Sequence, residues 1–297
     1  MTATRIFIIT LALISGCFSR LADPRLAAQS APAKAAEAVT MPMELLANRP
    51  IVRFTVNGQG PFAFLVAPKE PRSLIDPELA EALKLKQPKP GTASDLTVDL
   101  GFGAKHAEHI LKVPIVVEDL TRIASGFDKT TRPRGVISLS TWKDHTFTVD
   151  YQLWRITVEP GTLPEPNQKD VFALSPSGDF SLPITIAEQS LECRIDPLSP
   201  GGLVLPMSSV TPQQLDGTPR DLGTFKTSEG IVRVQEARLA TTVMLGPFEW
   251  KTPLVLLADR GEAATVGTPW LGRFAVTYDV TNARVRLTTP AATLSRR

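Results

Sequence analysis

The chain has 297 residues, of which 43% are hydrophobic and 21% are charged, and its formal net charge is +2. This composition excludes a disordered chain, because the apolar content suffices to bury a core in one or two domains. No segment is basic enough to indicate a nucleic-acid-binding surface. The 26 prolines flank many short apolar runs, which disfavours long helices and favours short strands separated by turns.

Residues 1–30 are typical of an export signal. Arg5 supplies a positive charge, and the apolar run at residues 6–14 is too short to span a bilayer as a helix. Residues 14–17 (ISGC) are similar to a bacterial lipobox, which predicts a lipoprotein leader with Cys17 lipidated. An ordinary signal peptide cleaved near residues 28–30 is the competing interpretation, and a buried apolar helix is the third.

Two cysteines are present, Cys17 and Cys193. Once the leader is removed or lipidated, Cys193 has no partner for an internal disulfide. Its neighbours alternate as in a strand, so it is predicted to be a small buried side chain. Residues from about 21 to 39 are rich in Ala, Pro, Ser and Lys and show no strand alternation. Residues 31–42 are therefore assigned to a linker between the leader and the first lobe.

Residues 43–160 are predicted to form a first β-rich lobe. Residues 50–56 alternate, residues 57–60 (NGQG) signal a turn, and residues 62–66 resume an apolar strand, which together indicate a hairpin. Asp76 is a good N-cap for one short helix, predicted at residues 77–85. Further strands are predicted at residues 96–100, 107–111, 114–117, 147–149 and 155–158.

Residues 161–177, rich in Pro, Gly, Ser and Asn, are predicted to link this lobe to a second one at residues 178–290. The two lobes share an internal repeat, because residues 147–150 (FTVD) match residues 276–279 (VTYD) at an offset of 129 positions.

The same offset places Ala67 on Asp196. A strand that begins with proline also recurs, at residues 114–117 and 253–256, with an offset of 139 that indicates a longer loop near residues 121–134 of the first half. The repeat predicts two similar β-lobes related by a pseudo-twofold axis.

Two stretches carry a resemblance to a known family: VNGQGPFAFLVAPKEPRSLIDPELAEAL in the first half and ITIAEQSLECRIDPLSPGGLVLP in the second. Each half resembles a lobe of the retropepsin and pepsin type of aspartic peptidase. In that family a hairpin delivers an Asp-Thr-Gly loop, and an apolar-apolar-Gly segment crosses behind it. Residues 265–267 are similar to that segment, and residues 135–138 are the counterpart in the first half, with Ser138 in place of glycine. The resemblance implies an all-β fold of two pepsin-like lobes.

Aspartic peptidases need one carboxylate from each lobe. The two acids share a proton, so that one activates water while the other polarises the scissile carbonyl. Here the resemblance places Ala67 at the first catalytic position and Asp196 at the second. Pro197 and Leu198 replace the threonine and glycine that support the acid in the family; proline offers no hydroxyl and no N–H, and leucine adopts positive φ only at a cost.

Other candidate residues have structural explanations. Asp76 is explained as a helix cap, and Asp150 and Asp279 as turn residues with a cross-strand arginine. His106 and His109 lack a third metal ligand. Lys69 and Arg72 of the altered first loop are hypothesised to face Asp196.

The sequence predicts an exported homologue of aspartic peptidases with impaired catalysis, located in the periplasm or bacterial envelope. It is expected to bind an extended peptide or protein in the cleft between the lobes, without cofactor, metal or nucleic acid. Contact with a membrane is expected only through a lipid on Cys17. An active endopeptidase that uses Asp196, for instance through dimerisation, and a structural envelope protein are the alternatives.

Overall fold

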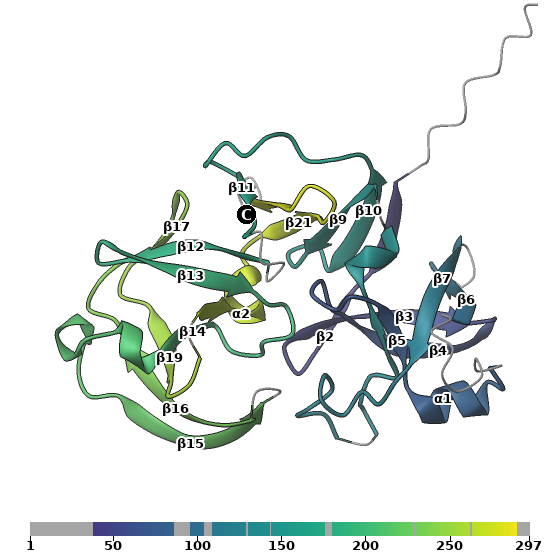
Figure 1. The fold of residues 1–297 in the computed structure, drawn as a ribbon, viewed down its shortest axis with the longest axis horizontal. Coiled ribbons are helices and arrows are strands. Elements are labelled where there is room, and N and C mark those ends of the chain that lie inside the picture. The colour runs from purple at the N-terminus through teal and green to yellow at the C-terminus, as the bar shows by residue number, and fades with distance from the viewer. Residues whose placement is uncertain are drawn as a thin grey trace, which may run out of the picture. The chain divides into compact units, whose positions relative to one another are not determined.

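The computed structural model describes residues 38–85, 96–103, 109–128, 130–142, 144–175, 180–227, 230–261 and 263–289, all within one compact unit. These residues form strands β1 to β22 and only short helices, so the chain is an all-β protein, as predicted (Figure 1). No helix within these ranges is long and apolar enough to cross a membrane.

The first half contains a closed ring of six strands. Its order is β3-β4-β8-β5-β7-β6, and it closes because β3 pairs with β6 as well as with β4. The predicted hairpin is confirmed as β3 and β4. One strand, β7, covers residues 109–111 of the first predicted strand and all of the strand predicted at residues 114–117, while residues 107 and 108 lie outside the described residues. The bounds are β2 Glu44–Leu46, β3 Arg49–Val56, β4 Gln59–Val66, β5 Ser73–Ile75, β6 Leu96–Phe102, β7 His109–Val117 and β8 Gly135–Ile137.

The second half repeats this order but stays open. Strands β12-β13-β20-β14-β19-β16 follow the sequence of pairings seen in the first half, with β17 and β18 added beyond β12 and β15 added beyond β16. The bounds are β12 Ser181–Ile186, β13 Gln189–Ile195, β14 Leu203–Pro206, β15 Arg220–Thr227, β16 Gly230–Arg238, β17 Val243–Leu245, β18 Phe248–Trp250, β19 Leu254–Ala258 and β20 Ala264–Val266.

A third sheet joins the two halves, in the order β1-β10-β9-β21-β22-β11. Its central strands, β9 and β21, are antiparallel, and Thr148 lies opposite Thr277, which is the same position in the repeat. Their hydroxyl oxygens are 2.9 Å apart. This register is symmetrical, so the predicted pseudo-twofold passes between these two threonines. The bounds are β1 Val39–Pro42, β9 His145–Asp150, β10 Arg155–Pro160, β11 Val171–Ala173, β21 Ala275–Asp279 and β22 Arg284–Thr288.

Both segments assigned to linkers contribute a strand to this sheet. β1 lies within residues 31–42 and pairs with β10, and β11 lies within residues 161–177 and pairs with β22. Each is short and takes an edge position, which explains why neither carries a strong alternating pattern in the sequence.

The helices differ from the prediction in number and in length. Helix α1 spans Pro77–Ala82 and ends before the predicted residue 85. The one short helix predicted for the first lobe is confirmed as α1. The second half has a short helix that the sequence did not predict, α2, which spans Thr268–Leu271 with Pro269 in its first turn. At the same position of the repeat, the first half has the 3₁₀-helix Leu139–Trp142. Two further 3₁₀-helices span Met207–Ser209 and Pro212–Gln214.

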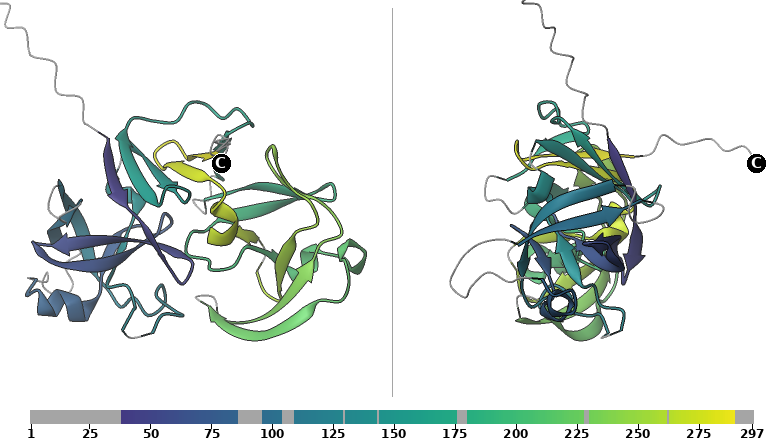
Figure 2. Two further views of the ribbon diagram at one scale, coloured as in Figure 1. Left: turned by 180° about the vertical axis from the view of Figure 1, so that it is seen from behind. Right: turned by 90° about the vertical axis from the view of Figure 1, so that its right-hand side faces the viewer.

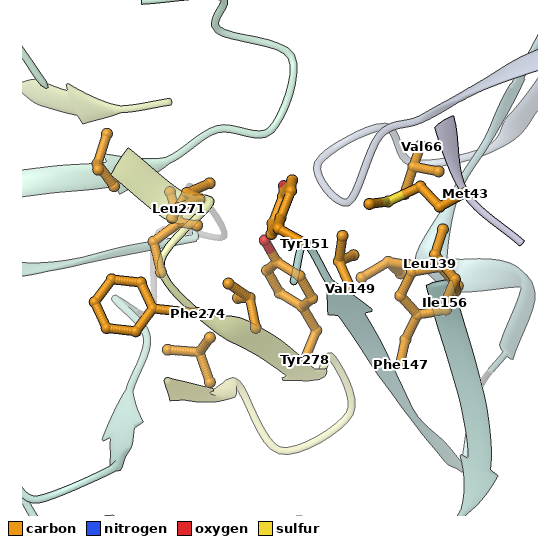
Figure 3. Packing of buried hydrophobic residues seen from close by; sticks show 14 of the residues in the cluster. Met43, Val66, Leu139, Phe147, Val149, Tyr151, Ile156, Leu271, Phe274 and Tyr278 are labelled. Carbon is orange, nitrogen blue, oxygen red and sulfur yellow. The ribbon is translucent and has the colours of Figure 1, made fainter. Parts of the chain in front are cut away.

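The hydrophobic core continues from one half to the other. Figure 3 shows buried side chains from both halves meeting around β9 and β21, with Phe147 and Val149 on one side and Phe274 and Tyr278 on the other. Because the core runs through the joining sheet, the two halves bury apolar surface together rather than as separate domains.

Asp76 fixes the long loop of the first half to helix α1. Its side chain is 1% exposed and accepts a hydrogen bond from Leu79 N at 3.1 Å, which confirms the predicted N-cap. The same carboxylate accepts from Arg132 Nη2 at 2.6 Å and from Arg134 Nη2 at 3.0 Å. One buried acid therefore caps the helix and holds the end of the loop that precedes β8.

Replacing Asp76 with alanine should lower the free energy of unfolding by at least about 2 kcal/mol, because a helix cap and two charge-assisted hydrogen bonds are lost together. Chemical denaturation measures the change. Glu78→Gln is the matched control: Glu78 lies 3.6 Å from the same two arginines but is 76% exposed, so its loss should cost no more than about 0.5 kcal/mol. Equal costs for the two variants would contradict this role of Asp76.

Candidate functional site

The loops that follow β4 and β13 are equivalent in structure. Ala67 N donates to Ile137 O at 3.0 Å, and Asp196 N donates to Val266 O at 2.9 Å. Each loop then turns back on itself, with Glu70 N donating to Ala67 O at 3.2 Å in the first half and Ser199 N donating to Asp196 O at 3.0 Å in the second. The structure therefore places Ala67 and Asp196 at the same position of the two halves.

Asp196 is held by the backbone of its own loop and by a cation of the other half. Its Oδ1 accepts from Leu198 N at 3.0 Å, and its Oδ2 lies 3.7 Å from Lys69 Nζ. The side chain of Asp196 is 29% exposed. Lys69 thus faces Asp196, as hypothesised from the sequence. Among the described residues, no carboxyl group is hydrogen-bonded to Asp196, so the observed neighbour of this acid is an ammonium group.

Ala67 is buried under apolar side chains. It is 1% exposed and belongs to a cluster, called here the Ala67 cluster, that also includes Ile123 and Ala124 of the loop between β7 and β8. Leu198 of the second half packs against this cluster, as does Phe127. The remaining buried members are Ile51, Leu65, Leu74, Leu120 and Val136. Position 67 is therefore enclosed by apolar side chains.

Arg49 holds the loop over the Ala67 cluster. Its Nη1 donates to Ser125 O at 2.6 Å, and its guanidinium carbon lies 4.8 Å from the centre of the Phe127 ring. Burial lowers the pKa of Arg49, and the charge of Asp196 acts in the opposite direction. Sequence analysis missed Arg49, because Ser125 is 76 positions away and no local pattern joins the two.

The segments that cross behind the two loops differ at the position that lies closest to each loop. At Gly267 an added Cβ would overlap the carbonyl oxygens of Ser199 and Gly201, so only glycine fits there. In the first half Ser138 takes this position, and its hydroxyl donates to the carbonyl of Glu70. The first loop therefore has room for a side chain that the second loop excludes.

Two buried tyrosines lie close to this region. Tyr151 and Tyr278 are 5% and 0% exposed, and Figure 3 shows both among the packed side chains. Burial raises the pKa of each, and the charge of Asp196 raises both further. Both phenols therefore stay neutral, and neither is suited to accept a proton as a general base.

The other candidate carboxylates have structural roles. Asp150 Oδ1 accepts from the amides of Gln152 and Leu153, both at 3.0 Å, and its Oδ2 lies 3.8 Å from Arg155 Nε. Asp279 accepts from Leu163 N at 2.8 Å and from Asn282 N at 3.1 Å.

The arginine that was expected to pair with Asp279 has other partners. Arg284 Nη1 donates to Leu163 O at 2.8 Å, and its Nη2 pairs with Glu165. The predicted cross-strand ion pair therefore forms in the first half, at Asp150 and Arg155, while Arg284 of the second half turns to Glu165.

Of the candidate metal and cysteine residues, the structure describes His109 and Cys193. His109 lies in β7, and its ring stacks on Phe102 with the centroids 5.3 Å apart. His106 and Cys17 lie outside the described residues. Within the described ranges, no group of three or more His, Cys, Asp or Glu side chains is placed to hold a metal ion. Cys193 is buried and free, and burial raises the pKa of its thiol to about 12, so it is predominantly a thiol at neutral pH.

Comparison with known proteins assigns no family to this chain. No family model matches the chain, and no curated protein matches it in sequence. Among solved structures the chain is similar to the basic 7S globulin from soybean, with 12% sequence identity and a TM-score of 0.49 over 86% of this chain and 95% of that one. This likeness is too distant to support a statement about activity. The assignment of a two-lobed fold rests on the strand order that the two halves share.

Gly267→Ala should destabilise the protein by about 3 kcal/mol or more, because the new methyl group overlaps two backbone oxygens that have no room to move. The melting temperature should fall accordingly. Gly201→Ala provides the control, since its Cβ would meet only the ends of Leu256 and Val204 at 3.1 and 3.2 Å. A Gly267→Ala protein as stable as the control would show that the loop of Asp196 is not packed as described.

Proposed function

We propose that this protein is an exported homologue of aspartic peptidases that binds extended peptide or protein segments without hydrolysing them. The observation that carries the proposal is the asymmetry of the two equivalent loops. One presents Asp196 paired with Lys69, and the other presents Ala67 under an apolar cluster. Hydrolysis by this mechanism needs two carboxyl groups that share a proton, and an ammonium ion cannot take the place of the second.

The packing around the loops also disfavours activity through dimerisation. Two Asp196 loops from separate chains would have to approach each other. Leu198 already lies against the Ala67 cluster, and Lys69 already faces Asp196. Both contacts would have to break, which exposes apolar surface and leaves an acid without its cation.

Binding without cleavage is compatible with an exposed strand edge in this fold. A β-protein with an exposed strand edge can recognise the backbone of an extended peptide through the hydrogen bonds of an added strand. Since Ala67 is buried, a bound peptide does not reach the position of the first acid. We therefore propose that the protein binds peptides at a surface other than the two loops of Ala67 and Asp196.

Purified protein should not cleave denatured casein between acidic and neutral pH. The measurement compares peptide release with and without a pepstatin-like inhibitor, for the wild type and for Asp196→Asn. Any trace of cleavage should be the same in all four samples, because no pair of acids exists to be inhibited or removed. Cleavage that the inhibitor blocks and that Asp196→Asn abolishes would overturn the non-catalytic assignment. The absence of both cleavage and peptide binding would favour a structural envelope protein.

Export and anchoring are tested at the N-terminus. We propose that the leader is recognised as a lipobox, so radiolabelled palmitate should be incorporated into the wild type and not into Cys17→Ser. Cys193→Ser is the control and should be labelled as strongly as the wild type, since Cys193 is buried. Equal labelling of the wild type and Cys17→Ser, or none in either, would favour the ordinary signal peptide.

A further inference from the structure

The sheet of the second half has a long strand, β15, at one of its edges. β15 is the last strand of its sheet and hydrogen-bonds only with β16 among the described strands. It has eight residues, whereas the other terminal strands, β1, β2, β11 and β18, have three or four. Figures 1 and 2 show the β15–β16 hairpin at the border of the molecule, with β15 outermost.

The beginning of β15 is protected against pairing with another chain. The register with β16 shifts between Asp221 and Gly223, which is a bulge, and Gly223 has φ of +91°. Ion pairs span the hairpin here, with Arg220 Nη2 2.7 Å from Glu236 Oε1 and Arg233 Nη2 2.8 Å from Asp221 Oδ2. Bulges and charges are the usual means by which proteins protect edge strands.

The rest of β15 contains no bulge. Residues 223–227 pair with β16 in regular register, so every second residue turns its backbone N–H and C=O toward the free edge. Phe225 in this stretch is 47% exposed. It stands opposite Val232 of β16, which is 7% exposed. An unpaired backbone edge beside an exposed aromatic ring is a template for an added strand.

We propose that residues 223–227 of β15 bind an extended peptide segment of a partner protein by strand addition. This inference rests on the proposed peptide-binding function and gives it a site away from Ala67 and Asp196. A residue of the added strand next to Phe225 lies on the same face as Phe225 and Val232, so it should be apolar or aromatic. Its neighbours lie on the face of Thr224 and Arg233 and should be polar.

Peptides are first selected from a phage-displayed library of random linear decapeptides, and the most enriched sequence is synthesised. The selected peptide should carry an apolar residue flanked by polar ones. Its affinity for Phe225→Asp should be lower by about tenfold or more, because an anchor contact is lost and a charge faces the added strand. Ile231→Asp is the control: Ile231 is 64% exposed, but it lies on β16, one strand away from the free edge of β15, and it stands opposite Lys226 rather than Phe225. Affinity should therefore stay within about twofold.

Hydrogen exchange locates the peptide independently of mutation. Saturating peptide should slow exchange of the amides at residues 223–227. Protection of residues 67–70 and 196–199 instead would overturn the β15 site and leave the proposed function intact. A library without enriched peptides would overturn both.

Two further measurements keep the variants interpretable. Phe225→Thr retains a good strand former, so it should bind as weakly as Phe225→Asp while unfolding at a temperature close to that of the wild type. Analytical ultracentrifugation tests whether the edge serves a second copy of this chain. A dimer that Phe225→Asp dissociates would assign β15 to self-association and would overturn the proposal.

Discussion

The symmetrical pairing of β9 with β21 is the constraint on which the rest of the structure depends. Thr148 lies opposite Thr277, and because these residues are equivalent in the repeat, the pairing relates each half to the other by a twofold rotation. That rotation brings the loop of Ala67 and the loop of Asp196 to the same region from opposite sides. The contacts between Lys69 and Asp196, and between Leu198 and the Ala67 cluster, follow from it.

The surroundings of Ala67 suit an apolar residue at this position. An aspartate at position 67 would be costly under a cluster of buried side chains, whereas alanine belongs there. The longer loop of the first half supplies Ile123 and Ala124 to that cluster, and Arg49 holds the loop through Ser125 and Phe127. On the other side, Lys69 gives Asp196 a cation where a peptidase has a second carboxyl group. These features support the proposed role in binding without hydrolysis.

The duplication is complete in strand order but not in closure. In the first half β6 returns to pair with β3, so the ring has no free edge beyond the short β2. In the second half β16 pairs with β15, and β12 pairs with β17, so the sheet ends in two open edges. An exposed edge of eight residues is a hazard for aggregation unless it is protected or used. The bulge and the two ion pairs lie at residues 220–223 and their partners on β16, and the proposed binding site uses the regularly paired residues 223–227.

The sequence by itself determined the features that short stretches encode: the all-β class, the hairpins, the cap at Asp76, the repeat, and the single acid of the two equivalent loops. Alternation of apolar and polar residues, turn residues and helix caps involve only a few neighbouring positions, so they can be recognised in the sequence alone. Only the tertiary structure decided what surrounds that acid. Arg49, Leu198 and the loop over Ala67 come from distant parts of the chain, and helix α2 and strands β1 and β11 form against neighbours that no local pattern announces. These contacts form because segments distant in the sequence pack against each other. A pattern of a few neighbouring residues does not predict such packing.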